Sequence, residues 1–244
     1  RESAVKALRA HAVDLSRCEL YVVPTDRVWV RDSGPTGVIR HGRLEWVNWK
    51  FNAWAKYDNY QADEQVGQRI AELSGHPYVK ATRSDGTPLV LEGGGIEGNG
   101  AGVLLVTEEW LLSDTQVRNP GMTRAEYEAV FRKYLGTTRT IWLGEGIVGD
   151  DTHGHVDDLA RFVDRNTVVL AYEEDPADEN YERTKDNLER LRRAAETIEG
   201  GLRIVTLPLP GPVIMDGERL TASYANFYIA NGVVMVPTFN DPAD

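Results

Sequence analysis

Three stretches of similar character decide the fold: Gly102-Val-Leu-Leu-Val106, Thr167-Val-Val-Leu-Ala171 and Gly232-Val-Val-Met-Val236. Their first residues are each separated by 65 positions, and one more step toward the N-terminus leads to Gly37-Val-Ile39. A fixed spacing of this size is the signature of a repeated supersecondary unit. The alternative is a coincidental spacing of strands in an ordinary α/β protein.

The segments around these strands agree with a repeat. Each strand follows a tight turn typical of a β-hairpin, at Asn99-Gly100, Arg165-Asn166 and Asn231-Gly232. Helical patterns then cover residues 59–74, 123–135 and 179–198, and short apolar strands cover 78–81, 140–143 and 202–207. Thr123-Arg-Ala-Glu126 is a capping box that marks the start of the second helix. The sequence therefore predicts strand–strand–helix–strand units of an α/β, propeller-like fold around a central site.

Composition limits the possible partners. Lys plus Arg total 27 against 38 Asp plus Glu, a net charge of −11, so a basic nucleic-acid face is not expected. No run approaches the roughly 18 apolar residues of a membrane helix. The single cysteine, Cys18, excludes internal disulfides and cysteine-rich zinc sites. Without a visible targeting signal we expect a cytoplasmic protein, and a homo-oligomer is compatible with the sequence.

The length fits an incomplete repeat array. The 244 residues hold about four units, which we expect to form one domain over residues 1–244. Arg1 lies in a helical-looking stretch and Asp244 follows an apolar strand, so we expect the sequence to be truncated at both ends.

The segment Asp150-Asp-Thr-His-Gly-His-Val-Asp-Asp158 concentrates polar side chains before the strand at 159–163. Two histidines followed by Asp157 resemble a metal site, but no further histidine follows His155, so the ligand count fails. A polar loop is a second interpretation. The third is acid–base chemistry: in an extended segment His155 and Asp157 face the same way, so the histidine can move protons while the carboxylate holds a cation.

The segment Leu89-Val-Leu-Glu-Gly-Gly-Gly-Ile-Glu-Gly-Asn-Gly100 contains the Gly-x-Gly-x-x-Gly spacing of a dinucleotide site. That motif must open a helix, whereas Asn99-Gly100 turns directly into a strand. We expect the glycines to let the backbone approach a ligand or another segment, a flexible loop being the alternative. Glu92 precedes Asp157 by 65 residues, so two units carry a carboxylate at the same point.

The segment Val28-Trp-Val-Arg-Asp-Ser-Gly-Pro35 places Trp29 near Asp32. An aromatic face together with paired carboxylates suits a guanidinium or ammonium ligand, through cation–π contact and charge-assisted hydrogen bonds. A tryptophan taken alone is more often a core residue.

Together these segments resemble the agmatine deiminase and bacterial peptidylarginine deiminase family. The resemblance covers essentially the whole chain and rests on Trp29-Val-Arg-Asp-Ser-Gly-Pro35, Phe51-Asn-Ala-Trp54, Leu91-Glu-Gly-Gly-Gly-Ile96, Gly154-His-Val-Asp-Asp-Leu-Ala-Arg-Phe162 and Ser223-Tyr-Ala-Asn-Phe-Tyr228. It implies a pseudo-fivefold α/β propeller that needs no metal and no organic cofactor. It also implies that Asp32 and Asp157 hold the substrate guanidinium, that Glu92 and His155 form the acid–base pair, and that Trp29 flanks the substrate channel.

The implied reaction is hydrolytic deimination of a small guanidinium substrate: agmatine to N-carbamoylputrescine and ammonia, a step of putrescine and polyamine metabolism. The family uses a cysteine nucleophile that forms an amidino-thioether. Its motif is expected downstream of Pro237-Thr-Phe239, beyond Asp244, and Cys18 is not its counterpart. A protein-arginine deiminase, a non-catalytic cation-binding propeller and a metallohydrolase remain alternatives at this point.

Overall fold

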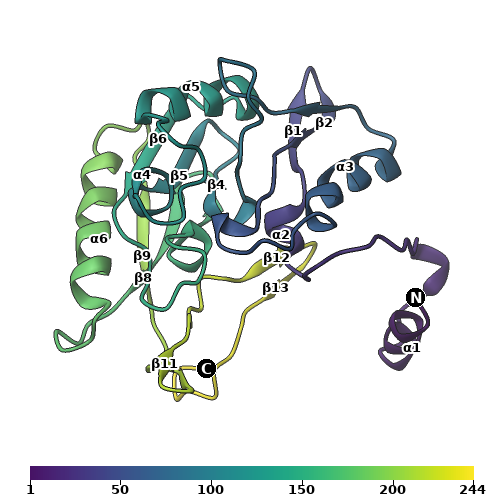
Figure 1. Ribbon diagram of the computed structural model, residues 1–244. Helices are drawn as coiled ribbons and strands as arrows, with labels where there is room; N and C mark the ends of the chain where they lie inside the picture. The colour runs from purple at the N-terminus through teal and green to yellow at the C-terminus, as the bar shows by residue number, and fades with distance from the viewer.

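The computed structural model describes residues 1–244 as three repeated α/β units followed by smaller hairpins (Figure 1). The first unit is β1 (Thr36–Arg40), β2 (Arg43–Asn48), α3 (Asp63–Ser74) and β3 (Tyr78–Lys80). The second is β4 (Glu97–Gly98), β5 (Val103–Thr107), α5 (Arg124–Leu135) and β6 (Arg139–Leu143). The third is β7 (Ala160–Asp164), β8 (Thr167–Tyr172), α6 (Tyr181–Ala195) and β9 (Arg203–Pro208).

The three sheets share one topology. In each unit the first strand pairs antiparallel with the second, and the second pairs parallel with the third. A helix makes the crossover to the third strand, as a parallel pair requires. The predicted strand–strand–helix–strand unit is therefore confirmed.

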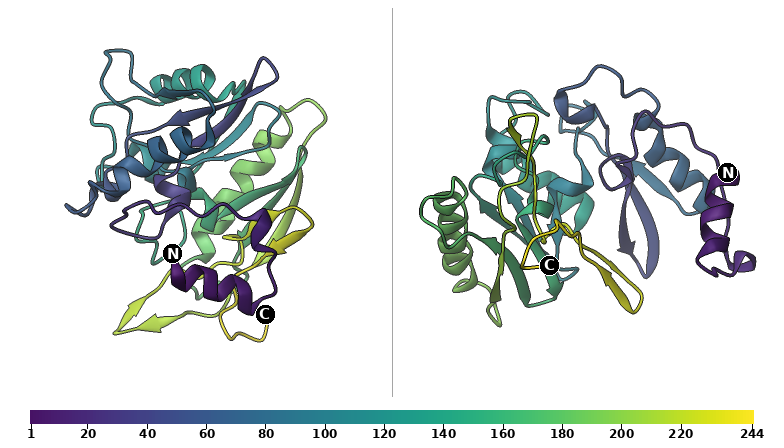
Figure 2. Two further views of the ribbon diagram at one scale, coloured as in Figure 1. Left: turned by 90° about the vertical axis from the view of Figure 1, so that its right-hand side faces the viewer. Right: turned by 90° about the horizontal axis from the view of Figure 1, so that it is seen from below.

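A fourth hairpin repeats the beginning of the unit. Strands β12 (Tyr228–Ala230) and β13 (Val233–Met235) pair antiparallel, after the short hairpin of β10 (Ile214–Met215) and β11 (Glu218–Arg219). Seen from below, the β12–β13 hairpin lies between the first sheet and the third (Figure 2). The closure of five units into a ring stays a prediction.

The alignment of the first unit by a step of 65 residues is wrong. Gly37 lies in β1, the first strand of its unit, whereas the strand equivalent to β5 and β8 is β2, which begins at Arg43. Only β2 pairs in parallel with the third strand of its sheet. The second unit is longer between its helix and the next unit, so the step from β2 to β5 is shorter than the later steps.

The sheet of the second unit is sandwiched between two apolar cores. Along β5 every residue is buried, and alternate side chains point to opposite faces. Leu104 and Val106 pack with α5 and the first unit, while Val103 and Leu105 pack with α6 and the third unit. A continuous apolar strand is what a sheet covered on both faces needs. The cores fix neighbouring units against each other and thereby fix the loops at their strand ends.

Helix boundaries follow the sequence closely, with one informative exception. The capping box of Thr123 and Glu126 is present at the start of α5. The helix expected from residue 59 begins only at Asp63, because its cap is a tertiary one. The Asp26 carboxylate accepts hydrogen bonds from the backbone N–H groups of Ala62 and Asp63.

The remaining helices are short. They are α1 (Glu2–Ala10), α2 (Val30–Ser33), α4 (Glu108–Leu112) and the one-turn 3-10 helices η1 (Leu15–Arg17), η2 (Ala53–Ala55), η3 (Gly93–Gly95) and η4 (Val156–Asp158). Helix α1 has no buried residue and stands apart from the body (Figure 1). None of the helices combines the length and the apolar character needed to cross a bilayer.

Candidate active site

Three carboxylates reach one place from equivalent positions of the three units. Asp32 lies in α2 just before β1, Glu92 precedes η3 and β4, and Asp157 lies in η4 just before β7. All three are buried. The expectation that Glu92 and Asp157 occupy the same point of their units agrees with this placement, and Asp32 adds the first unit to the pattern.

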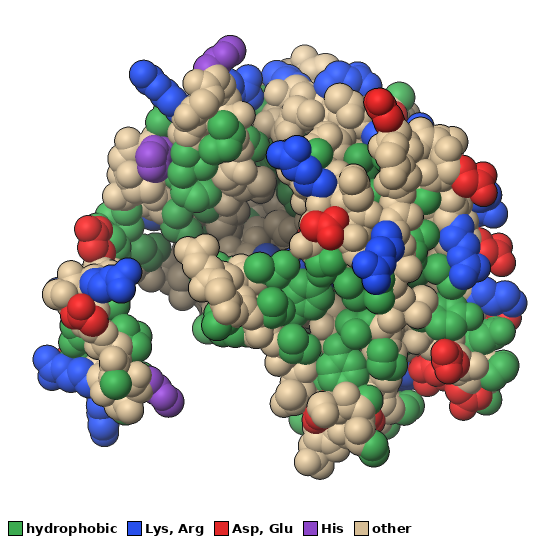
Figure 3. All heavy atoms as spheres, turned by 180° about the vertical axis from the view of Figure 1, so that it is seen from behind, with side chains coloured by type: hydrophobic (Ala, Val, Ile, Leu, Met, Phe, Trp, Pro, Cys, Tyr) green, Lys and Arg blue, Asp and Glu red, His purple; other side chains and the backbone are tan.

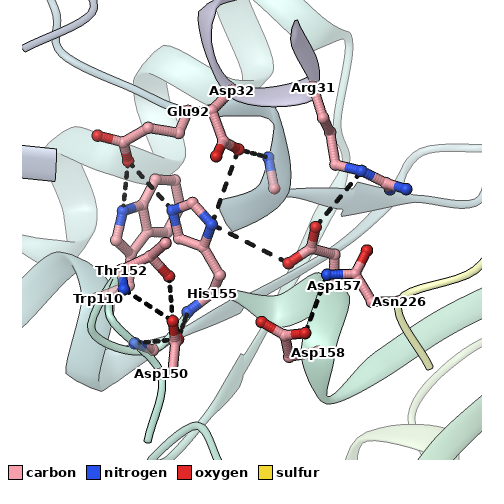
Figure 4. Close-up of polar contacts among 12 residues, drawn as sticks. Arg31, Asp32, Glu92, Trp110, Asp150, Thr152, His155, Asp157, Asp158 and Asn226 are labelled. Carbon is pink, nitrogen blue, oxygen red and sulfur yellow. Dashed lines mark hydrogen bonds and ion pairs between the residues drawn. The ribbon is translucent and has the colours of Figure 1, made fainter. Parts of the chain in front are cut away.

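The imidazole of His155 lies between the carboxylates (Figure 4). Its Nε2 is 3.5 Å from Glu92 Oε2, and its Nδ1 is 3.8 Å from Asp32 Oδ1 and 4.0 Å from Asp157 Oδ1. The side chain is only 2% exposed, and Nε2 has no hydrogen-bond partner. The structure therefore brings together all four residues that the sequence selected for acid–base and cation-binding roles.

Glu92 is held by two donors. Trp110 Nε1 donates to Oε2 at 2.7 Å, and Arg118 Nε donates to Oε1 at 3.1 Å. Burial disfavours the ionised carboxylate, but the positive charges of Arg118 and His155 outweigh burial and lower the pKa of Glu92 to about 2. Glu92 is thus an anion at any physiological pH.

The other ionisable groups respond to burial and to each other. Burial opposes the imidazolium of His155, yet the charges of Asp32, Glu92 and Asp157 raise its pKa to about 9. Burial raises the pKa of Asp157 to about 6 and also raises the pKa of Asp32. Next to them, burial and the charge of Asp157 raise the pKa of Asp158 well above its usual range. The cluster is short of positive charge for its number of carboxylates.

The loop before η4 sets the position of His155. The Asp150 carboxylate accepts hydrogen bonds from the backbone N–H groups of Thr152, Gly154 and His155, each at 2.8 Å (Figure 4). It also accepts the Thr152 hydroxyl at 2.5 Å. Gly154 has φ +95°, a backbone conformation that favours glycine. Asp150 therefore shapes the turn that delivers the imidazole.

The glycine run allows close approach, as expected, and does not form a dinucleotide loop. A Cβ on Gly94 would lie 2.7 Å from Asp32 Oδ1, 2.7 Å from His155 Nδ1 and 2.9 Å from Asp157 Oδ2. The Gly94 N–H donates to Asp32 Oδ1 at 2.9 Å. Backbone thus fills the space where any side chain would displace the carboxylates.

Several residues at the site were not selected from the sequence. Trp54 Nε1 donates to Asp32 Oδ2 at 3.2 Å, from a turn in which Ala53, Trp54 and Ala55 all have positive φ. Three consecutive non-glycine residues in this region are strained, which is common at functional sites. The family-like stretch 51–54 was a signal for Trp54. No sequence signal marked Trp110 or Arg118.

Other predicted or considered residues lie away from the cluster. Trp29 precedes α2 with its side chain 61% exposed, and no polar contact joins its indole to the carboxylates; its role at a channel stays a prediction. The Cys18 thiol donates to the Asp14 carbonyl in the N-terminal segment. His153 turns away from His155, toward Ser113 and Glu109. No group of three or more His, Cys, Asp or Glu side chains is arranged to hold a metal ion.

The site opens to a surface of irregular shape. Seen from behind, the molecule has a deep hollow near the centre of the face, with charged side chains of both signs around it (Figure 3).

Comparison with known proteins identifies the family. The model of the Porphyromonas-type peptidyl-arginine deiminases matches residues 1–244. The chain belongs to this family. An agmatine deiminase of Stutzerimonas stutzeri is 38% identical over 267 aligned positions, which cover 99% of this chain and 71% of that protein. An agmatine deiminase of Pseudomonas syringae pv. tomato is 36% identical, covering 95% of this chain and 68% of that protein.

Solved structures of this deiminase family agree. Agmatine deiminase of Enterococcus faecalis superposes with a TM-score of 0.80 at 32% identity, covering 92% of this chain and 66% of that one. A cysteine-to-serine variant of C. jejuni agmatine deiminase with substrate bound gives a TM-score of 0.83 at 29% identity, covering 98% and 68%. The deiminase resemblance of the sequence is therefore confirmed, and the chain spans about two thirds of these relatives.

Proposed function

We propose that this deiminase-family chain forms the substrate cage and the acid–base pair of an enzyme that deiminates agmatine hydrolytically. The products are N-carbamoylputrescine and ammonia. Asp32 and Asp157 are the proposed guanidinium ligands, because two carboxylates can each accept charge-assisted hydrogen bonds from a planar cation. A small cationic substrate, and not nucleic acid or a membrane, is the expected partner.

One observation carries the proposal: buried carboxylates outnumber the cations beside them. Asp32, Glu92 and Asp157 are all buried, and only Arg118 and His155 are buried cations in contact with the three. The raised pKa of Asp157, about 6, reports an ionised form that lacks a partner in a desolvated place. A guanidinium would restore the balance.

The acid–base pair suits both halves of the reaction. A thiolate adds to the guanidinium carbon, and the tetrahedral adduct loses ammonia as His155 donates its proton to the leaving nitrogen. His155 carries that proton at neutral pH because its pKa is about 9. The neutral imidazole then accepts a proton from water, which attacks the amidino-thioether and releases the ureido product and the thiol. Glu92 stabilises the imidazolium at 3.5 Å.

The nucleophile is a separate part of the proposal. The resemblance places it in a cysteine motif that follows Phe239 in family members, and Cys18 has no contact with the cluster. Trp54 and Trp110 replace Trp29 as the tryptophans that hydrogen-bond the site carboxylates. Trp29 keeps its proposed place at the channel.

The wider setting is proposed on weaker ground. We propose a single-domain, pseudo-fivefold propeller, supported by three complete units and a hairpin that repeats the start of another. We also propose a cytoplasmic role in putrescine formation, with a homo-oligomer as a possible assembly, because agmatine is the precursor that the reaction consumes.

Two measurements test the proposal. Calorimetry with residues 1–244 should show agmatine binding that is lost in Asp157→Asn. A colorimetric assay for ureido product, run on the natural full-length protein, should show product from agmatine. The family model is named for peptidyl-arginine deiminases, so arginine and arginyl peptides are the second candidate substrates. Product from none of the three would refute the proposal, and product from a peptide alone would reassign the substrate.

A further inference from the structure

Arg118 lies behind Glu92, away from the two cage carboxylates. Its side chain is completely buried, and all of its polar groups are directed to fixed partners. Nε donates to Glu92 Oε1 at 3.1 Å, Nη1 donates to the Gln116 carbonyl at 2.8 Å, and Nη2 donates to the Thr152 carbonyl at 2.5 Å. One guanidinium therefore joins Glu92 to the loop that carries His155.

The link is geometrically short. Thr152 is held by the same Asp150 carboxylate that accepts the His155 N–H. Arg118 thus fixes Glu92 on one side and the anchored turn of His155 on the other. The separation of 3.5 Å between Glu92 and His155 depends on both attachments.

The charged surroundings of Glu92 leave Arg118 as its fixed cation. Arg118 faces it from the segment after α4, His155 from the loop before η4, and Asp32 from α2. Tyr127 of α5 is the other titratable group that responds to its charge. His155 must lose its proton during the proposed reaction, whereas a guanidinium keeps its charge throughout.

We propose that Arg118 is a positioning residue of the deimination, which keeps Glu92 anionic and holds it at a fixed distance from His155. The inference rests on the proposed function of the pair. When His155 donates its proton, Glu92 would lose its second cation, and a buried carboxylate without a cation takes up a proton. Arg118 prevents this, so that Glu92 can stabilise the imidazolium again when water is deprotonated.

Two substitutions separate charge from geometry. Arg118→Met removes the charge and every hydrogen bond. Arg118→Lys keeps the charge beside Glu92 but cannot reach Glu92, Gln116 and Thr152 together, because lysine lacks the planar fork of arginine. Arg161→Met is a matched control: Arg161 is also a buried arginine, with a 2.8 Å pair to Glu97 and a 2.7 Å bond to the Phe227 carbonyl.

The first test reads the ionisation of Glu92 without any catalysis. Residues 1–244 are labelled with ¹³C at the glutamate carboxyls, and the Glu92 signal is assigned through Glu92→Gln. We expect Glu92 to be ionised at pH 4 in the unmodified chain, in Arg118→Lys and in Arg161→Met. In Arg118→Met its titration midpoint should rise above 4.5. A folded Arg118→Met in which Glu92 is still ionised at pH 4 would overturn the charge role.

The second test reads geometry in the natural full-length protein. Because acid–base catalysis contributes on the order of 10²–10⁴-fold, Arg118→Lys should lower kcat for agmatine at least tenfold. KM should change less than threefold, since Asp32 and Asp157 are untouched. An unchanged kcat would overturn the positioning role even if Arg118→Met fails to fold. If the unmodified protein does not act on agmatine, the proposed function fails, while the Glu92 titration still decides the charge role.

Discussion

The charge balance around His155 gives the sharpest prediction, through Asp32→Asn. His155 Nδ1 and Asp32 Oδ1 are 3.8 Å apart, and both side chains are buried. With an effective dielectric constant of about 20, two unit charges at that distance interact by about 4 kcal/mol. At about 1.4 kcal/mol per pH unit this would lower the His155 pKa by about 3. Because Glu92 and Asp157 remain, we expect the midpoint to fall from about 9 to roughly 6–7.

Proton NMR can follow this titration, since the chain has only five histidines. The His155 signal is assigned as the one lost in His155→Gln. The matched control is Asp151→Asn, which removes a carboxylate four residues away that contacts Lys56 and Tyr57 at the surface and should leave the midpoint near 9. A folded Asp32→Asn that still titrates above pH 8 would show that Asp32 does not set the charge of His155.

Three further predictions concern agmatine binding measured by calorimetry. Asp157→Asn should weaken binding by ~3–5 kcal/mol, because it removes one charged partner of a buried cation; a change below about tenfold, or roughly 1.4 kcal/mol, would place Asp157 outside the cage. In the unmodified chain affinity should fall about tenfold per pH unit below pH 6, since the raised Asp157 pKa means that protons then compete with the cation; a flat profile from pH 7 to 5 would contradict this. Gly94→Ala should reduce affinity at least tenfold, because its Cβ would lie 2.7 Å from both Asp32 and His155, whereas at Gly98 the nearest atom is 3.6 Å away; equal affinities for Gly94→Ala and Gly98→Ala would argue against the close approach.

Much of the fold was accessible from the sequence because it depends on local patterns. The 65-residue spacing predicted the second and third units, and the capping box predicted the start of α5. The first unit broke the spacing, since a loop of different length shifts a register that only strand pairing fixes. The start of α3 was misplaced for a similar reason: its capping carboxylate, Asp26, is far away in sequence.

The site divides in the same way. The sequence by itself determined Asp32, Glu92, His155 and Asp157, because a repeat places chemically similar groups at equivalent points and family-like motifs surround each of them. Only the tertiary structure decided how they are held and charged. Arg118, Trp54 and Trp110 reach the carboxylates across 26, 22 and 18 residues of chain. Such contacts leave no periodic pattern, and the pKa values that they set arise from burial and charge separation, which exist only once the units pack together.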